Sequence, residues 1–407
     1  MIRKKQILFL IFIMAAVLLT SCGQKEDAGS LAVDENISAS LTYDHRMQLD
    51  YAKEFAVDYY NDGLALITIS DGSRFLVVPQ KEEAPDDLDS DIVVLKQPVD
   101  HIYLVASATM DMFRSLDALD AISLSGTKKD GWYIDEARQA MDNGSILYAG
   151  KYSAPDYEQI LDTGCNLSIQ STMIYHSPEI KENLEKFGIP VLVDHSSYET
   201  HPLGRTEWVK LYGVLEGKED VAEQVFAEQK DAVAAASDGE NTGKTVAFFY
   251  ITSNGSVNVR KSGDYVPKMI ELAGGKYIFS DLGADTDASS SVNMQMEEFY
   301  ARAKDADYLI YNSTIEGEVK SLDALLAKSD LLSDFKAVKD GNVFCTTQNL
   351  YQRSMELGTM TGDIHTMLEG EENADETYTF LFRLQKKKGI CGFVRRSYFA
   401  ASHSCGM

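Results

Sequence analysis

Strands and helices alternate in two separate stretches of this 407-residue chain. The strands of the first stretch are expected at residues 101–105, 166–170 and 189–193, and its helices at 110–119 and 178–187. The strands of the second stretch are expected at 245–251, 308–311 and 342–346, with a helix at 264–272. Such alternation with short connections predicts parallel sheets covered by helices. The expected fold class is therefore α/β, with two Rossmann-like lobes.

One long helical pattern separates the two stretches. Trp208, Leu211, Tyr212 and Leu215 recur at helical spacing within a mostly polar segment, and Gly217 interrupts the pattern. We therefore expect one long connecting α-helix over residues 204–237. The N-terminal lobe is then residues 98–203, and the C-terminal lobe is residues 244–384.

The N-terminus has the features of an export signal. A short basic region precedes an apolar run from Ile7 to Leu19, which is too short to span a bilayer comfortably. The run ends in Leu19-Thr20-Ser21-Cys22, which resembles the bacterial lipobox. We expect a lipoprotein signal peptide over residues 1–21, lipidation of Cys22 and a flexible tether over 22–40. The alternative is an ordinary signal peptide with an incidental cysteine.

Two further segments lie outside the predicted lobes. In residues 41–97, two β-rich runs around Ser70-Asp71-Gly72-Ser73 predict a β-hairpin extension. Residues 385–407 form a basic tail without acidic residues, in contrast to the rest of the chain, and we assign it no function.

Composition and motifs exclude several functions. The 38 Lys and Arg residues against 63 Asp and Glu give a net charge of −25, which disfavours binding to nucleic acid. Five cysteines in a chain this long do not form a disulfide scaffold. No serine-hydrolase, zinc-protease or P-loop motif is present in the sequence. We therefore expect a binding protein rather than an enzyme.

Candidate ligand-binding residues follow the predicted strands, because ligands of open α/β sheets bind beyond the carboxyl ends of the strands. These loops combine aromatic, amide and basic groups, which suits a large ligand that is partly anionic and partly aromatic. Each residue could instead have a structural role. The candidates are Trp132, Lys151, Tyr175, Tyr198, Arg205, Arg260, Lys261, Asn312, Tyr351 and Arg353.

With the lipobox and the connecting helix, five stretches carry a resemblance to a known family: Pro98–Leu104, Gly188–Val193, Glu207–Leu215, Ile270–Gly275 and Val338–Phe344. The chain resembles the substrate-binding lipoproteins of iron-complex and cobalamin ABC importers. The resemblance implies a periplasmic-binding-protein fold with a rigid linker helix and a ligand cleft between the lobes. It also implies a ferric siderophore, haem or cobalamin as ligand, a permease dimer as partner, and a lipid anchor on the outer face of the membrane.

The resemblance further implies roles for single residues. One glutamate on each lobe would dock on the permease: Glu158 on the first lobe, and Glu297 or its neighbour Glu298 on the second. Helix capping alone could also explain these glutamates. Iron or cobalt would be present only as part of the transported ligand, and a haem iron could be ligated by Tyr175, Tyr198, His176 or His201. A surface haem relay and a tetrapyrrole metal chelatase-like enzyme are the alternative functions.

Overall fold

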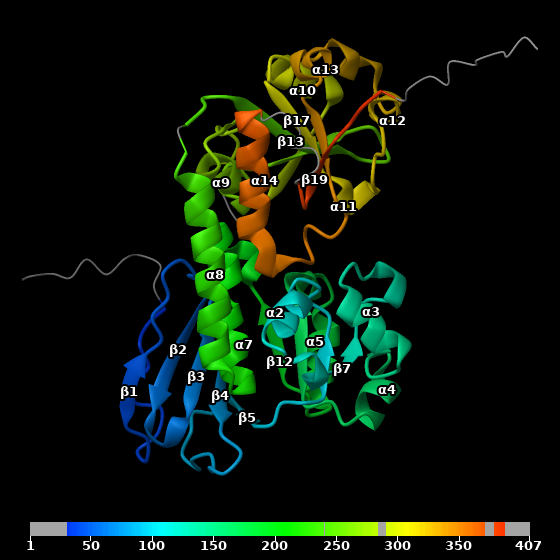
Figure 1. The fold of residues 1–407 in the computed structure, drawn as a ribbon. Coiled ribbons are helices and arrows are strands. Elements are labelled where there is room, and N and C mark those ends of the chain that lie inside the picture. Colours follow the sequence, from blue (N-terminus) through cyan, green and yellow to red (C-terminus); the bar gives the residue numbers. More distant parts are fainter. Residues whose placement is uncertain (1–30, 240, 284–289, 371–377, 387–407) are drawn as a thin grey trace, which may run out of the picture. The chain divides into compact units, whose positions relative to one another are not determined.

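The computed structural model describes residues 31–239, 241–283, 290–370 and 378–386, which divide into two compact units (Figure 1). The first unit contains the chain up to Lys230 together with Gln352–Leu357, and the second contains Asp231–Tyr351 and the chain from Gly358 onward. The predicted signal peptide, the lipidation site Cys22 and residues 387–407 of the basic tail lie outside the described residues. Within the described ranges, none of the helices combines the length and apolarity needed to cross a membrane.

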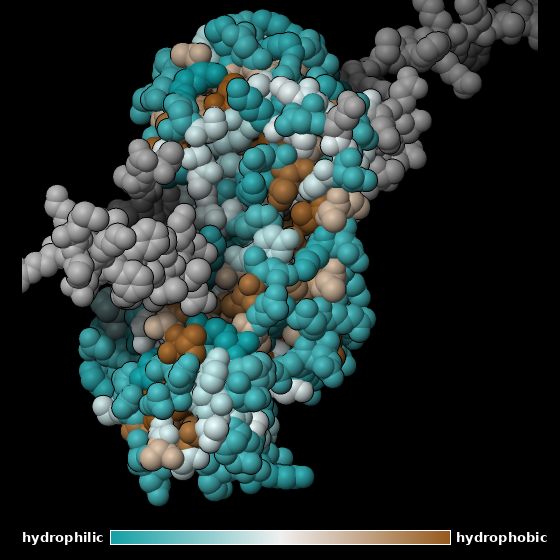
Figure 2. Space-filling model, turned by 90° about the vertical axis from the view of Figure 1, so that its left-hand side faces the viewer, coloured by the Kyte–Doolittle hydropathy of each residue, from teal (hydrophilic) through white to brown (hydrophobic). Residues whose placement is uncertain are grey.

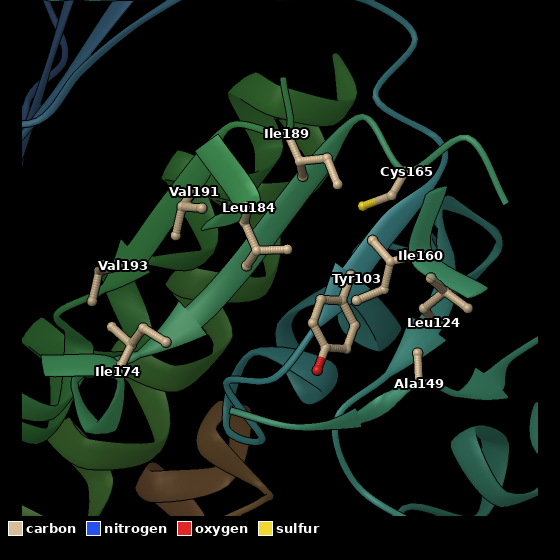
Figure 3. Close-up of a cluster of buried hydrophobic side chains, with 10 residues drawn as sticks. All are labelled: Tyr103, Leu124, Ala149, Ile160, Cys165, Ile174, Leu184, Ile189, Val191 and Val193. Carbon is tan, nitrogen blue, oxygen red and sulfur yellow. The ribbon is translucent and has the colours of Figure 1, made fainter. Parts of the chain in front are cut away.

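The first unit contains a parallel sheet of five strands in the order β12-β11-β6-β7-β8. Its strands are β6 (Ile102–Leu104), β7 (Ile122–Ser125), β8 (Leu147–Tyr148), β11 (Leu167–Ser171) and β12 (Val191–Asp194). The helices between them are α2 (Thr109–Ser115), α3 (Asp135–Asp142), α4 (Tyr157–Asp162) and α5 (Pro178–Lys186). Ile160 of α4 and Leu184 of α5 pack against Tyr103 and Val191 of the sheet (Figure 3). The predicted parallel sheet of the first lobe is confirmed.

A second sheet of five strands occupies the region where only a hairpin was predicted. Its strands are β1 (Tyr43–Arg46), β2 (Phe55–Tyr60), β3 (Ala65–Ile69), β4 (Arg74–Val78) and β5 (Ile92–Lys96). The predicted hairpin is the β3–β4 pair, whereas β5 adds in parallel to β4 after a charged connection. We call these five strands the N-terminal sheet. It belongs to the first unit rather than being a separate extension.

Residues 31–40 pack against the N-terminal sheet, so the prediction of a flexible tether is wrong for this part of the chain. Ile37 is 3% exposed in an apolar cluster with Leu66 and Leu76. The Arg46 guanidinium donates hydrogen bonds to the carbonyl oxygens of Leu31 (2.6 Å) and Ala32 (2.7 Å). Burial of Ile37 and these two bonds offset the entropy of ordering a polar segment.

The predicted connecting helix is divided into three helices: α6 (Pro202–Glu207), α7 (Val209–Glu216) and α8 (Glu219–Ser237). Gly217 ends α7 with a left-handed φ of 62°, a conformation that glycine adopts without the Cβ clash of other residues. The boundary between the two units falls inside α8, after Lys230.

The second unit contains a seven-stranded sheet with a parallel centre and antiparallel edges. Its strands are β13 (Thr245–Ile251), β14 (Val257–Arg260), β15 (Lys276–Tyr277), β16 (Ser291–Met294), β17 (Tyr308–Tyr311), β18 (Val343–Thr346) and β19 (Leu381–Arg383). β13, β17 and β18 are parallel as predicted, but β14, β16 and β19 run antiparallel to their neighbours. The short turn between β13 and β14 permits only an antiparallel pair, because a parallel pair needs a crossover connection.

Helices complete the second unit. They are α9 (Tyr265–Leu272), α10 (Met296–Ala303), α11 (Ser313–Glu316), α12 (Leu322–Leu326), α13 (Lys336–Asp340) and α14 (Leu357–Glu369). Hydrophilic residues cover most of the surface that Figure 2 shows, in keeping with the acidic composition.

Candidate functional site

Two predicted tyrosines of the first unit meet at the carboxyl edge of its parallel sheet. Tyr175 lies in the 3₁₀ turn η4 (Thr172–His176) that follows β11, and Tyr198 lies in η5 (Ser196–Tyr198) after β12. Both rings contact His195, with ring centroids 5.8 Å and 5.0 Å away respectively. The strands β11 and β12 are adjacent and parallel, and this arrangement brings the two loops together.

The Tyr175 side chain can offer a ligand its ring more readily than a phenolate oxygen. Its hydroxyl donates to Asp71 Oδ2 at 2.8 Å and lies 2.6 Å from His195 Nε2, while the residue stays 41% exposed. Burial of the hydroxyl, together with the nearby Asp71 carboxylate, raises the pKa of Tyr175 above its ordinary value. The ionised form that would ligate iron is therefore disfavoured.

Two other candidates of the first unit are buried, which corrects the expectation that they present their side chains to a ligand. Trp132 is 1% exposed, and its indole Nε1 donates to Ser125 Oγ at 3.2 Å. Arg205 is 8% exposed, and its Nη1 donates to the Ser196 carbonyl oxygen at 3.1 Å. Both side chains support the loops at the sheet edge from inside the unit. Lys151, in the short strand β9 (Gly150–Lys151), is exposed.

His201 also has a structural role in the first unit. Its Nδ1 accepts a hydrogen bond from the Leu203 backbone N–H at 3.1 Å and so caps α6. Its ring stacks on Tyr51 at 4.6 Å between ring centroids. A metal could be ligated through Nδ1 only if this cap were lost.

Arg353 belongs to the first unit, although the sequence places it with the second stretch. It precedes η7 (Ser354–Glu356) and forms a 2.7 Å ion pair with Glu356. The same segment is bound to the first unit through Gln352, whose amide donates to the Gly131 carbonyl oxygen (2.7 Å) and accepts from the Tyr133 N–H (2.7 Å). These contacts join residues more than 200 positions apart, so no local pattern could have revealed them.

Two predicted residues of the second unit, Arg260 and Asn312, converge on the hydroxyl oxygen of a third, Tyr351. This oxygen accepts hydrogen bonds from Asn312 Nδ2, at 2.9 Å, and from the Arg260 guanidinium. Asn312 directly follows β17, at the carboxyl edge of the parallel strands, and the Arg260 side chain extends from the antiparallel strand β14 to the Tyr351 hydroxyl there. The Arg260 guanidinium also lies over the Tyr351 ring, 5.2 Å from its centroid. Lys261, the next residue, is half-buried.

The charge of Arg260 is partly balanced within the second unit. Asp264 Oδ2 lies 3.6 Å from its Nη1, and the same nitrogen donates to Ser290 Oγ at 3.2 Å. A guanidinium fixed beside an aromatic ring, with a buried amide next to it, can bind a carboxylate or hydroxamate oxygen and a flat apolar surface together.

The described residues give no support for a bound metal ion of the protein's own or for a reactive thiol. They contain no group of three or more His, Cys, Asp or Glu side chains that could hold a metal ion. Cys165 and Cys345 are free and buried, and burial raises their thiol pKa values to about 11 and about 12. Both thiols therefore stay protonated and act as small apolar side chains.

The two predicted docking glutamates are exposed at helix N-termini. Glu158 lies in the first turn of α4, which Asp156 caps by accepting from the Gln159 N–H at 3.1 Å. Glu297 and Glu298 lie in the first turn of α10. Their exposure is compatible with docking, and also with stabilisation of the helix dipole alone, so the docking role stays a prediction.

The fold agrees with the comparison to known proteins. Residues 105–350 match the periplasmic binding protein family, and because this match covers more than half of the chain, the protein belongs to that family. The α/β fold class and the suspected family are thereby confirmed.

Individual relatives are more distant. An uncharacterized lipoprotein of Methanocaldococcus jannaschii is 25% identical over 369 residues, which cover 86% of each chain. A periplasmic heme-binding protein of Vibrio cholerae has 15% identity and a TM-score of 0.53, and the match covers 64% of this chain and 96% of that one. An ABC-type Fe³⁺-hydroxamate transport protein of Saccharomonospora viridis has 19% identity and a TM-score of 0.52, with 66% and 92% covered. At these identities the two solved structures establish a shared fold.

Proposed function

We propose that this protein captures an iron complex or a corrinoid outside the cell and delivers it to the permease of an ABC importer. The observation that carries the proposal is the convergence of Arg260 and Asn312 on the Tyr351 hydroxyl at the carboxyl edge of the second unit's sheet. This edge is where open α/β sheets bind ligands, and membership of the periplasmic binding protein family supports a solute as the ligand.

The chemistry of the two sheet edges favours a ferric complex whose ligand supplies its own metal donors. In the second unit, Arg260 and Lys261 attract anionic oxygens and the Tyr351 ring provides apolar area. In the first unit, the rings of Tyr175 and Tyr198 provide apolar area. The raised pKa of Tyr175 disfavours direct ligation of iron by its phenolate. A heme-binding protein and an Fe³⁺-hydroxamate transport protein with the same fold make these two ligands the first to test.

Membrane attachment is the second part of the proposal. Lipidation of Cys22 would place the protein on the outer face of the membrane, and the lipoprotein of M. jannaschii that covers 86% of this chain supports an anchor of this kind. Docking on a permease would then use Glu158 and Glu297, one on each unit.

The test is a ligand titration of the protein that begins after Cys22, so that residues 31–40 keep their packing. A ferric hydroxamate, haem and cobalamin are added separately, and tryptophan fluorescence and the ligand absorption spectrum are followed. Saturable binding at sub-micromolar concentration by one of the three supports the proposal and identifies the cargo. If none of them binds, the proposed ligand class is wrong.

Two matched variants test whether the second unit contributes to ligand binding. Arg260→Gln should weaken the binding of an anionic complex by roughly tenfold or more, since a charge-assisted hydrogen bond contributes about 1.5–3 kcal/mol. Arg302→Gln, on α10 of the same unit, removes an arginine that pairs with Asp281 and should leave affinity unchanged. Metal insertion into a free tetrapyrrole by the purified protein would instead support the chelatase alternative.

A further inference from the structure

His195 lies between two carboxylates that come from the N-terminal sheet. Its ring is nearly buried, with 5% of the side chain exposed, at the carboxyl end of β12. Glu54 Oε2 lies 3.9 Å from Nδ1 on one side of the ring, and Asp71 Oδ2 lies 3.9 Å from Nε2 on the other. Each carboxylate reaches the ring through a hydroxyl group, Ser70 on the Glu54 side and Tyr175 on the Asp71 side.

Four hydrogen bonds connect these five side chains. Ser70 Oγ donates to Glu54 and lies 2.9 Å from His195 Nδ1. The Tyr175 hydroxyl donates to Asp71 at 2.8 Å and lies 2.6 Å from His195 Nε2. An ionised carboxylate can only accept, so the single hydrogens of Ser70 and Tyr175 are both committed to carboxylates. The two bonds to the imidazole then each need a hydrogen from the ring itself.

A neutral imidazole carries one N–H and can satisfy only one of these two bonds, whereas an imidazolium carries two and satisfies both. The carboxylates are ionised in this arrangement: the His195 ring, 3.9 Å away, and the Ser70 hydroxyl lower the pKa of Glu54 despite its partial burial. For Asp71, burial acts to raise the pKa, but hydrogen bonds from Ser73 and Tyr175 outweigh it, and the pKa is lowered.

We propose that His195 is held as an imidazolium by the two carboxylates of the N-terminal sheet and acts as the positioning residue for Tyr175. The N-terminal sheet thereby becomes part of the candidate binding edge. The hydroxyl of Tyr175 is fixed from both sides, so its ring, which is 41% exposed, has a defined orientation. The role of Tyr175 in contacting ligand rests on the proposed function, but the protonation state of His195 does not.

The groups around the ring favour a positive charge there. The titratable groups facing His195 are Glu54, Asp71, Tyr175 and Tyr198, of which only the two carboxylates are charged at neutral pH. The nearby cation Arg205 bonds the backbone of Ser196. With His195 protonated, the two acids and the ring carry a net charge of −1, and loss of its proton leaves −2 and one unmade hydrogen bond. A neutral His195 would therefore hold the Tyr175 hydroxyl less firmly.

The first test is ¹⁵N NMR of the imidazole groups in the protein that begins after Cys22, with the His195 signals assigned through His195→Gln. At pH 7.5 a free histidine is mostly neutral. The expected result for His195 is two protonated ring nitrogens. A proton-free ring nitrogen on His195 at this pH, in the folded protein, would overturn the proposal.

Two matched aspartate variants test whether the His195 ring carries two N–H groups. In Asp71→Asn, the new amide can donate to the Tyr175 oxygen, so the Tyr175 hydrogen can turn to Nε2 and a neutral His195 fits. We expect this variant to be folded and to contain neutral His195 at pH 7.5. Asp89→Asn removes an exposed aspartate that pairs with Arg74 of the same sheet, and should leave His195 doubly protonated. An unchanged His195 in Asp71→Asn contradicts the proposal.

Positioning is measured on Tyr175 itself. The Tyr175 ring signals at pH 7.5 should change in His195→Gln and in Asp71→Asn, and should be unchanged in Asp89→Asn. With any ligand that binds, affinity at pH 7.5 should fall roughly fivefold in His195→Gln, the effect of about one hydrogen bond, and should stay unchanged in Asp89→Asn. Tyr175 signals that are the same in His195→Gln as in the wild type refute positioning. Failure of every ligand to bind would refute the proposed function and leave the NMR result standing.

Discussion

The buried carboxylate of Glu207 accepts a hydrogen bond from the Tyr51 backbone N–H at 2.8 Å. It also accepts from the N–H groups of Asp50 and Ala52, both at 2.9 Å. The next two N–H groups, of Lys53 and Glu54, donate to the buried carboxylate of Glu199 at 2.9 and 3.0 Å. Five consecutive backbone donors before β2 are thus bound by two acids near α6. This contact attaches the N-terminal sheet to the remainder of the first unit.

Glu207→Ala should lower the free energy of unfolding by about 3–5 kcal/mol, because it leaves three backbone donors without their acceptor and removes one of the two carboxylates that pair with the buried Lys210. Glu223→Ala provides the control, since Glu223 also pairs with Lys210 but its side chain is 66% exposed, and its loss should cost less than about 1 kcal/mol. Urea unfolding of both variants measures the difference. Equal losses would show that the attachment does not depend on Glu207.

Glu158→Arg combined with Glu297→Arg should abolish ligand uptake in cells while leaving ligand affinity unchanged, because both residues are exposed and charge reversal would repel a basic docking surface. Uptake of labelled ligand and a binding titration are the two measurements. Glu182→Arg combined with Glu185→Arg, at two exposed positions of α5, makes the same change in net charge and is the control. Normal uptake by the double variant would remove the docking assignment.

Tyr351→Phe should lower the free energy of unfolding by about 1–3 kcal/mol, because Asn312 Nδ2 is buried and loses its acceptor. The Arg260 guanidinium loses the same acceptor, so the affinity for an anionic ligand should change as well. Tyr300→Phe, a tyrosine of α10 that contacts Phe335 through its ring, is the matched control. Thermal melts with and without ligand separate the two effects. A fully stable Tyr351→Phe protein would show that this hydroxyl is dispensable.

Glu216 should make stability fall as the pH rises. Its carboxyl Oε1 is buried without a hydrogen-bond partner among the described residues, and burial, followed by the nearby Asp120, raises its pKa to about 8. Because the folded state holds this proton more tightly than the unfolded state, stability is greatest below about pH 4.5 and is lost progressively up to about pH 8.

Glu216→Gln removes this titration, so it should raise the melting temperature by a few degrees at pH 9 and by less at pH 5. Glu228→Gln, on the exposed surface of α8, should shift the melting temperature little at either pH. Scanning calorimetry at the two pH values gives the comparison. The same shift at both would mean that Glu216 is already ionised in the folded protein at pH 5.

Local sequence patterns determined the central strands of the second unit's sheet. The apolar runs at Thr245–Ile251 and Tyr308–Tyr311 are strands with the predicted bounds, because β-branched and aromatic residues in short runs favour buried strands whatever their partners. The same reasoning placed Tyr175, Tyr198, Asn312 and Tyr351 in loops near the strand ends. It could not separate these from Trp132 and Arg205, whose burial depends on packing by distant segments.

Tertiary structure decided how these pieces combine. The sequence predicted only a hairpin where the N-terminal sheet has five strands. β1 has the sequence Tyr-Asp-His-Arg, which shows no apolar pattern, and β5 pairs with β4 only across a charged connection. The sequence alone determined the acidic composition and the α/β class, since composition and periodicity are local properties. The meeting of Asp71 with Tyr175, or of Arg260 with Tyr351, depends on contacts about 100 residues apart, which only the folded chain creates.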